Sequence, residues 1–284
     1  MAQGRHNMTK SRIVTGFSIV AGILALLYFL PVMAVQILVS IVFTLGAYEW
    51  AGLIGKQAVS RGTKLLYSLV VFIAIHCAAY FLGIWQAINL PLLQEVMGFT
   101  CLFWSFCLLW VLSYPQSALL WSKVWFIAVM GLLILIPSAL AIQYLLGLPQ
   151  GKWLFLFFIT IVSLADTGAY FSGKQWGNKK LAPKVSPGKS WAGFFGGIIV
   201  VCFFALFIAK FSSPFTYGFS TLILVSILTV LASVLGDLVE SMVKREADKK
   251  DSSDLLPGHG GIMDRIDSIT AAAPVFVLLI LLVK

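Results

Sequence analysis

Apolar runs long enough to cross a lipid bilayer recur along this chain, separated by short polar breaks. A bilayer core about 30 Å thick requires roughly 20 apolar residues per helix. We count about nine such runs, at 13–30, 32–54, 65–82, 99–113, 123–146, 153–172, 191–210, 218–237 and 269–283. Because 60% of the residues are hydrophobic and only 11% are charged, too little polar surface remains for a soluble globule. The sequence therefore predicts an all-α polytopic integral membrane protein.

Two of these runs leave the count of spans open. The run 99–113 is short for a full crossing and the run 269–283 reaches the last residues, so either could be tilted or re-entrant. Eight or ten spans are compatible with the same sequence. The first run, 13–30, has no small-residue cleavage pattern after it, so we expect a retained helix and not a removed signal peptide.

The basic residues are distributed unequally between the two sides that nine spans would define. Cytoplasmic loops of membrane proteins accumulate Lys and Arg. One side receives 17 of the 20 basic residues: Arg5, Lys10, Arg12, Lys56, Arg61, Lys64, Lys123, Lys174, Lys179, Lys180, Lys184, Lys189, Lys244, Arg245, Lys249, Lys250 and Arg265. We therefore expect a cytoplasmic N-terminus in a bacterial inner membrane. The net charge of +9 reflects orientation and contact with anionic lipid, and no nucleic-acid partner is expected.

The four cysteines lie inside apolar runs, with no Cys-x-x-Cys pair. We expect buried, reduced thiols and neither a zinc site nor a disulfide. No internal repeat or low-complexity linker divides the chain. We therefore treat 1–284 as one membrane domain, with N-terminal helices at 1–113 and a segment at 114–284 that carries the polar site.

Acidic residues are concentrated near the C-terminus. Eight of the 11 lie between Asp237 and Asp267, and Asp166 stands near the end of the sixth run. A bilayer tolerates carboxylates only where they pair, coordinate or orient another group. Because these carboxylates meet the densest basic loops on one side of the membrane, we predict a polar site there.

A helical face emerges from the spacing after the eighth run. Asp237, Ser241, Lys244 and Asp248 follow steps of four, three and four residues. A solvated helix end with ion pairs one turn apart would show the same spacing. Asp237 differs because it directly follows the apolar run 226–236, where an unpaired charge is costly. A metal or a cation is therefore the favoured partner of Asp237.

The segment 256–267, LPGHGGIMDRID, surrounds a histidine with three glycines and then places two aspartates one helical turn apart. Gly260 and Gly261 beside His259 indicate backbone that approaches an anion closely, with amides exposed as a phosphate-binding nest. Asp264 and Asp267 could open the last span, one as a magnesium ligand and the other as a second ligand or a partner of Arg265. A glycine-rich turn that caps a membrane helix is the alternative.

These residues resemble a known signature. The stretch Ser241–Asp267 is similar to that of the phosphatidate cytidylyltransferases, or CDP-diacylglycerol synthases. The positions that match are Ser241, Lys244, Arg245, Lys250, Asp251, Ser253, Leu256, Pro257, His259, Gly260, Gly261, Asp264, Arg265 and Asp267.

Further segments of the chain support the same resemblance. ADTGAY at 165–170 and KVSPGKSW at 184–191 occur in the family's order, as does YEW at 48–50. Ala192 departs from the polar or acidic residue that relatives often have, so no role is assigned to it. Asn178 stands where a basic residue is common, which puts one secondary phosphate contact in doubt.

The resemblance implies that the phosphate of phosphatidic acid attacks the α-phosphorus of CTP and expels pyrophosphate. Such transfers depend on charge neutralisation and alignment. Magnesium would bind Asp237, Asp264 and Asp267, and the same residues are compatible with a second cation. Asp237 and Asp264 with Lys244, Arg265 and Ser241 form the predicted catalytic set. The predicted substrate-binding set is Asp166, Lys174, Lys184, Ser186, Lys189, Ser190, Arg245, His259, Gly260 and Gly261.

Most of these residues also have a structural interpretation. Orientation in the membrane alone would explain the basic loop at 174–189. The serines could cap helices, and His259 could stabilise a turn. Gly193 and Gly197 form a small-residue face that would permit close packing, within the bundle or in a homodimer.

Two other function classes remain. A CTP-dependent polyprenol or lipid kinase would use similar loops but release CDP instead of pyrophosphate. A transporter would explain many spans with intramembrane charge, but we find neither mid-bilayer charges nor repeat symmetry in the sequence.

Overall fold

The computed structural model describes residues 22, 24–56, 58–211, 218–253, 255 and 260–283. Eight helices in these residues are long and apolar enough to cross a membrane. They are α2 (Val32–Ala51), α3 (Arg61–Phe81), α4 (Leu90–Leu112), α6 (Val124–Gly147), α7 (Gly151–Trp176), α8 (Trp191–Phe211), α9 (Phe219–Glu246) and α10 (Met263–Val283). The all-α polytopic class is therefore confirmed, and the protein is a multi-pass membrane protein.

The eight helices match eight of the nine predicted spans. Of the remaining run, 13–30, residues 24–29 are helical and most of the others lie outside the described residues. The N-terminal residues Arg5, Lys10 and Arg12 also lie outside them. The exact count of nine and the orientation stay predictions.

Helix α4 is longer than the sequence predicted. It begins at Leu90 and not at Phe99, so the fourth span is a full crossing of 23 residues. Asn89 caps it, accepting a hydrogen bond from the Leu92 backbone N–H at 3.1 Å. Pro91 lies in the first turn, where a missing N–H costs nothing. The helix could therefore begin before the polar residues that had bounded the apolar run.

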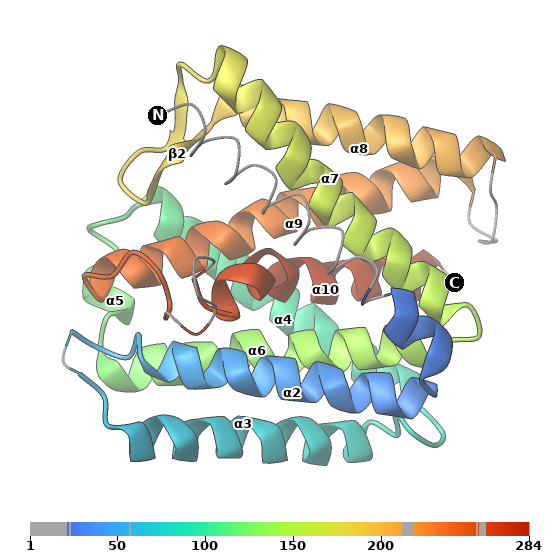
Figure 1. The fold of residues 1–284 in the computed structure, drawn as a ribbon, viewed down its shortest axis with the longest axis horizontal. Helices are drawn as coiled ribbons and strands as arrows, with labels where there is room; N and C mark the ends of the chain where they lie inside the picture. The colour runs from blue at the N-terminus through green and yellow to red at the C-terminus, as the bar shows by residue number, and fades with distance from the viewer. Residues whose placement is uncertain are drawn as a thin grey trace, which may run out of the picture.

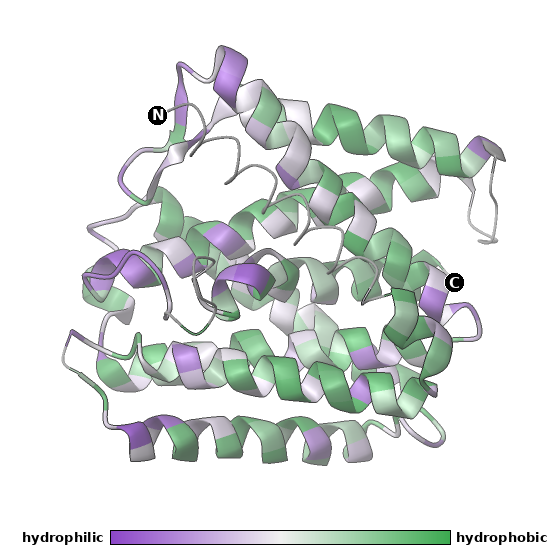
Figure 2. Ribbon diagram, viewed as in Figure 1, coloured by the Kyte–Doolittle hydropathy of each residue, from purple (hydrophilic) through white to green (hydrophobic). Residues whose placement is uncertain are grey.

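The helices form one bundle with α10 near its centre (Figure 1). Helices α2, α3 and α6 contact one another on one side, and α7, α8 and α9 lie on the other. Helix α10 contacts α2, α4, α6, α7 and α9. Figure 2 shows hydrophobic residues along the helix bodies, whereas hydrophilic residues gather at the end that carries the hairpin and the α9–α10 loop.

The face with Gly193 and Gly197 is used inside the bundle. A Cβ atom on Gly197 would meet the Ala165 carbonyl oxygen at 2.6 Å, and one on Gly193 would meet the Ala169 carbonyl at 2.7 Å. Only glycine lets the backbones of α7 and α8 approach so closely. Of the two predicted uses of this face, packing within the bundle is the one observed, and it fixes Asp166 on α7 relative to the N-terminal end of α8.

A short β-hairpin joins α7 to α8 and was not predicted. Strand β1 (Lys180–Ala182) pairs antiparallel with β2 (Ser186–Ser190), with Lys180 opposite Ser190. Ser190 is buried and its Oγ accepts the Gly193 backbone N–H at 3.2 Å, which caps the first turn of α8. The hairpin therefore holds the basic loop in a defined position beside α9.

Candidate active site

The predicted acidic residues converge where α9 ends and α10 begins. Asp237 lies on α9, and Asp264 and Asp267 lie in the first two turns of α10. Gly236 makes this convergence possible, because a Cβ atom there would overlap the Asp267 carbonyl oxygen. The two helix backbones therefore touch at this level.

Asp237 is paired in the way that its position predicted. Its Oδ2 lies 2.7 Å from the Lys189 Nζ atom of β2, and both side chains are largely buried. Its Oδ1 accepts a hydrogen bond of 3.2 Å from Ser241 Oγ, one turn further along α9. The structure thus joins the hairpin to the end of α9 through one lysine and one carboxylate.

Lys244 links the two helices. Its Nζ atom lies 2.5 Å from Glu240 Oε2 on the same helix and 2.6 Å from Asp264 Oδ1 on α10. Glu240 is buried, and its Oε1 has no hydrogen-bond partner among the described residues. An ammonium group between two carboxylates offsets part of the cost of burying them.

Asp264 is engaged from several sides. Besides Lys244, its carboxylate accepts hydrogen bonds from the Gly261 backbone N–H at 2.7 Å, from Ser252 Oγ at 2.9 Å and from the Ser252 N–H at 3.1 Å. A carboxylate offers about four acceptor sites. Asp264 therefore anchors the loop before α10 in this structure, and a metal ion could bind it only by displacing one of these donors.

Glu49 is a residue whose role the sequence reasoning missed. It lies in the last turn of α2, is 1% exposed, and holds the loop from the other side. Its carboxylate accepts hydrogen bonds from Ser253 Oγ (2.6 Å), Ser252 Oγ (3.2 Å) and the backbone N–H groups of Met263 (2.6 Å) and Ile262 (3.0 Å). Glu49 thus supplies, from another helix, the acceptor that the start of α10 requires.

The loop after α9 corrects one sequence prediction. Asp248 was placed on the face of Asp237 and Lys244, but α9 ends at Glu246 and Asp248 has a φ of 56°. Its carboxylate instead lies 3.4 Å from Lys56 Nζ in an exposed pair. A left-handed residue cannot continue the α-helix, so the periodicity fails there.

A neighbouring lysine ties the same loop to the end of α2. Lys249 Nζ donates a hydrogen bond of 2.6 Å to the Gly52 carbonyl oxygen. Partial burial lowers the pKa of Lys249, and the charge of Lys64 lowers it further. The loop is therefore held against α2 at Gly52 as well as at Glu49.

The remaining predicted residues lie around this centre at varying distance. Arg245 donates from Nε to the Val185 carbonyl at 3.3 Å and so supports the hairpin. Lys174, in the last turn of α7, and Lys184 are exposed, and Ser186 is half-buried in β2. His259 lies outside the described residues, and Gly260 adopts a left-handed φ of 77° that favours glycine.

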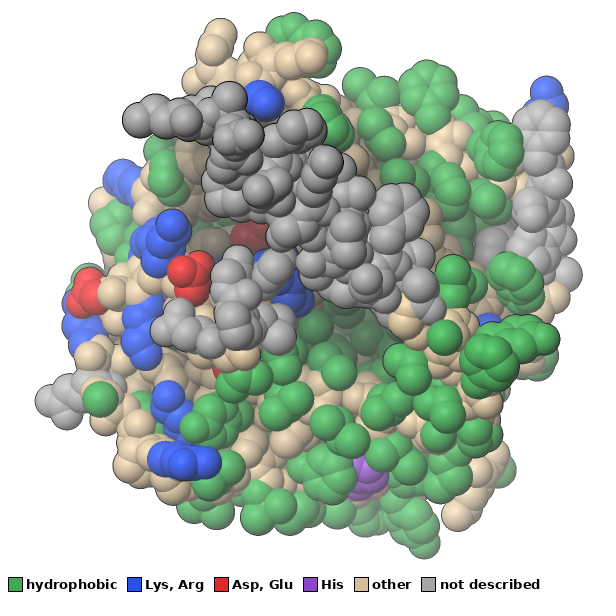
Figure 3. Space-filling view, viewed as in Figure 1, with side chains coloured by type: hydrophobic (Ala, Val, Ile, Leu, Met, Phe, Trp, Pro, Cys, Tyr) green, Lys and Arg blue, Asp and Glu red, His purple; other side chains and the backbone are tan. Residues whose placement is uncertain are grey.

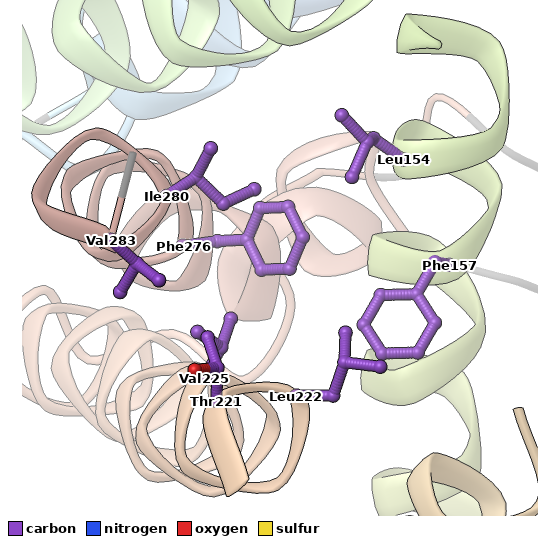
Figure 4. A pocket seen from close by; sticks show the side chains of 8 residues that line it. All are labelled: Leu154, Phe157, Thr221, Leu222, Val225, Phe276, Ile280 and Val283. Atoms are coloured by element: carbon purple, nitrogen blue, oxygen red, sulfur yellow. The ribbon is translucent and has the colours of Figure 1, made fainter. Parts of the chain in front are cut away.

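Two cavities meet at Asp166. One, of about 190 Å³, is also lined by Lys189, Ser190 and Gly193, and the other, of about 160 Å³, by Arg265 and Asp267 among others. Figure 3 shows lysine, arginine and acidic side chains gathered at this end, beside the hairpin and the end of α9. The other end of α7, α9 and α10 differs, because apolar residues such as Leu154, Leu222 and Phe276 converge there and leave about 10 Å³ (Figure 4).

The donor set fits a hard cation. Five carboxylates lie in this region, whereas the ion pairs formed there involve two ammonium groups, those of Lys189 and Lys244. The carboxylates are Asp166, Asp237, Glu240, Asp264 and Asp267. Within the described ranges, no three His, Cys, Asp or Glu side chains form a complete metal site by themselves. Magnesium commonly uses one or two carboxylates together with substrate phosphates, so the excess of carboxylates is compatible with an ion that arrives with an anionic substrate.

Comparisons with known proteins identify the family of this chain. The model of the cytidylyltransferase family matches residues 10–283. A phosphatidate cytidylyltransferase of Pseudomonas aeruginosa is 38% identical over 275 residues, which cover 96% of this chain and 97% of the relative. One of Haemophilus influenzae is 36% identical over 294 aligned positions, covering 95% and 97%. One of Bacillus subtilis is 40% identical over 129 residues, covering 45% and 48%. The chain therefore belongs to the cytidylyltransferase family, and phosphatidate cytidylyltransferases are among its full-length relatives.

Proposed function

We propose that this protein is a CTP:phosphatidate cytidylyltransferase of phospholipid biosynthesis, which converts CTP and phosphatidic acid into CDP-diacylglycerol and pyrophosphate. The observation that carries the proposal is the cluster of carboxylates and lysines at the α9–α10 junction, built from the signature that this chain shares with the family. A lipid phosphate and a nucleotide triphosphate both require cationic partners and a polar site within reach of the membrane.

The reaction forms a bond between a phosphate oxygen of phosphatidic acid and the α-phosphorus of CTP, and breaks the bond from that phosphorus to the β-phosphate oxygen. Pyrophosphate leaves with the electron pair. The attacking phosphate is already ionised near neutral pH, so no general base is required. The protein has to bind two anions close together and keep the reacting atoms in line.

The cationic residues divide this work by position. Two lysines lie inside the site. Lys189 forms an ion pair with Asp237, and Lys244 forms ion pairs with Glu240 and Asp264. Lys174, Lys184, Arg245 and Arg265 surround it and would hold the outer phosphate oxygens. Ser241 and Ser186 would donate hydrogen bonds to substrate phosphates. In this structure Ser241 donates to Asp237 instead, and the third serine of the predicted set, Ser190, caps α8. Gly260 and Gly261, with His259, would offer backbone donors to a phosphate.

The carboxylates would hold magnesium. Asp237 and Asp267 would act as ligands, with Asp264 joining if it exchanged a present donor, and the ion would neutralise charge on the triphosphate. Glu240 Oε1, which is buried without a hydrogen-bond partner in the described part of the chain, supports a second cation near Lys244.

We also propose that the site faces the cytoplasm from a bacterial inner membrane. The basic residues of the hairpin and of the α9–α10 loop lie at the same end of the bundle (Figure 3), which the positive-inside rule assigns to the cytoplasmic side. A homodimer remains a prediction. Because Gly193 and Gly197 are used against α7, a dimer would have to form through another face.

The test follows both products. Purified protein in detergent micelles receives phosphatidic acid, magnesium and α-labelled CTP, and lipid-bound label and pyrophosphate are measured together. Stoichiometric label in lipid and free pyrophosphate is the expected result. Release of CDP with an unlabelled lipid product would replace the proposal with the lipid kinase. Absence of nucleotide turnover in well-folded protein would refute nucleotide chemistry and would favour the alternative function, a transporter.

A further inference from the structure

A large apolar cavity lies beside the site and has no role in the chemistry described above. Its volume is about 620 Å³, and it is bounded by the end of α4, the hairpin, the start of α8 and the middle of α9. Most of its walls are hydrocarbon, from residues such as Leu112, Leu181, Phe194, Leu231 and Leu235. An apolar space of this size is unsuited to ordered water and to a nucleotide.

This cavity adjoins the polar site. Leu181, Phe194 and Val234 line both the apolar cavity and the smaller cavity of Asp166 and Lys189. Lys189 in turn contacts Asp237. Only these apolar side chains, and no helix backbone, are common to the linings of the two cavities, so a hydrocarbon-lined space lies directly beside an ammonium group of the site.

The cavity also runs from the site towards the bilayer interior. On α9 its lining extends from Leu238, the residue after Asp237, back to Leu231. Leu231 is six residues from Asp237, about 9 Å along a helix. Leu231 and Leu112 are 38% and 73% exposed on membrane-spanning helices, so the outer rim faces lipid.

We infer that this cavity binds an acyl chain of the lipid substrate while the phosphate of the same molecule lies at Lys189. The inference rests on the proposed function and specifies how the lipid is held. An amphiphile with an anionic head and a hydrocarbon tail matches both the ammonium group of the site and the apolar cavity beside it. Lys184, which also lines the cavity, lies where a second basic contact to the headgroup would be made.

A matched pair of variants on α9 tests the inference. Leu231→Trp narrows the far end of the cavity, whereas Leu224→Trp places the same side chain on the same helix at a residue that is 53% exposed and outside the cavity lining. Each variant is assayed in mixed micelles with dioleoyl and with dihexanoyl phosphatidic acid. The short chains would not extend to Leu231.

We expect Leu231→Trp to raise KM for the dioleoyl lipid about tenfold, which corresponds to losing the burial of about two methylene groups. KM for CTP and the rate with the dihexanoyl lipid should stay within about twofold of the wild-type values, and Leu224→Trp should behave as wild type. Equal effects of both tryptophans, or an equal loss with both lipids, would overturn the inference.

A second measurement needs no variant. Phosphatidic acid with a diazirine near the end of its acyl chain is irradiated with the wild-type protein, and cross-linked peptides are mapped. Peptides containing Phe194 or Leu231 should be labelled, and label confined to other lipid-facing helices would refute the site. Failure of the wild-type protein to convert either lipid would instead refute the proposed function, and the inference with it.

Discussion

Replacing Glu49 by glutamine should impair the site without touching any predicted catalytic residue. The side chain keeps its size, but one oxygen becomes an NH₂ group that cannot accept. Each carboxylate oxygen now accepts from one serine hydroxyl and one backbone N–H: Oε1 from Ser253 and Ile262, and Oε2 from Ser252 and Met263. The hydroxyls can rotate away, whereas the backbone N–H cannot. Either orientation of the amide therefore strands one buried N–H.

The expected loss of rate follows from the one backbone N–H that loses its acceptor. A stranded buried donor costs about 1–3 kcal/mol. If the loop must adopt this conformation for turnover, the rate should fall by a factor between about five and about 150, at 1.4 kcal/mol per tenfold change. Glu49→Ala, which removes all four acceptor contacts, should be worse.

The assay is label transfer from CTP to phosphatidic acid at several magnesium concentrations, with the thermal unfolding midpoint measured on the same preparations. Glu95→Gln is the matched control, because Glu95 is an exposed carboxylate in the first turns of α4. A rate for Glu49→Gln within twofold of the wild-type rate, at every magnesium concentration, would refute the idea that Glu49 positions the loop.

Four other outcomes are expected. Asp237→Asn and Asp264→Asn should each lower turnover at least about 100-fold in protein that still inserts, and a near-wild-type rate at limiting magnesium would refute the metal assignment of that residue. Lys179→Ala should change the rate less than about threefold, because Lys179 is exposed at the start of the hairpin; a loss as large as that of Asp264→Asn would contradict this. Chelation of magnesium by EDTA should abolish label transfer and readdition should restore it, whereas transfer that persists would exclude a required divalent ion. Gly197→Leu should lower the free energy of unfolding by about 1–3 kcal/mol through overlap with the Ala165 carbonyl, and an unchanged unfolding midpoint would show that α7 and α8 can separate without cost.

The spans could be predicted because length and apolarity alone decide them in a bilayer. The convergence of Asp237 with Asp264 and Asp267 could also be anticipated, since the sequence places all three beside the basic loops on one side of the membrane. The catalytic and binding roles of these residues stay predictions. Asp264 illustrates the difference, because spacing suggested a ligand and the structure shows a carboxylate that already accepts from Lys244, Ser252 and Gly261.

Local backbone features escaped the sequence reasoning. The polar hairpin strands lack the alternating pattern that announces a strand. The start of α4 was missed because polar residues before Phe99 interrupt the apolar run, although the helix continues through them and has Pro91 in its first turn. The turn at Asp248 was missed because helical spacing continued in the sequence after the helix had ended.

Glu49 could have been noticed but not explained. Glu49 is a carboxylate at the end of an apolar run and, like Asp237, would be expected to need a partner that offsets its charge. Its partners, however, are more than 200 positions away along the chain, and nothing local in the sequence indicates them. Long-range contacts of this kind become visible only once the helices are packed.

The distance in sequence between Glu49 and its donors has a consequence for biosynthesis. The contacts separate residues by 203 to 214 positions, so at about 5–20 residues per second Glu49 waits on the order of 10–40 s after its own synthesis before Met263 is made. During that interval helix α2 carries a carboxylate that only water or lipid headgroups can solvate, which keeps its end at the membrane surface. The last helix to emerge from the ribosome then supplies the partners, so catalytic competence depends on completion of nearly the entire chain.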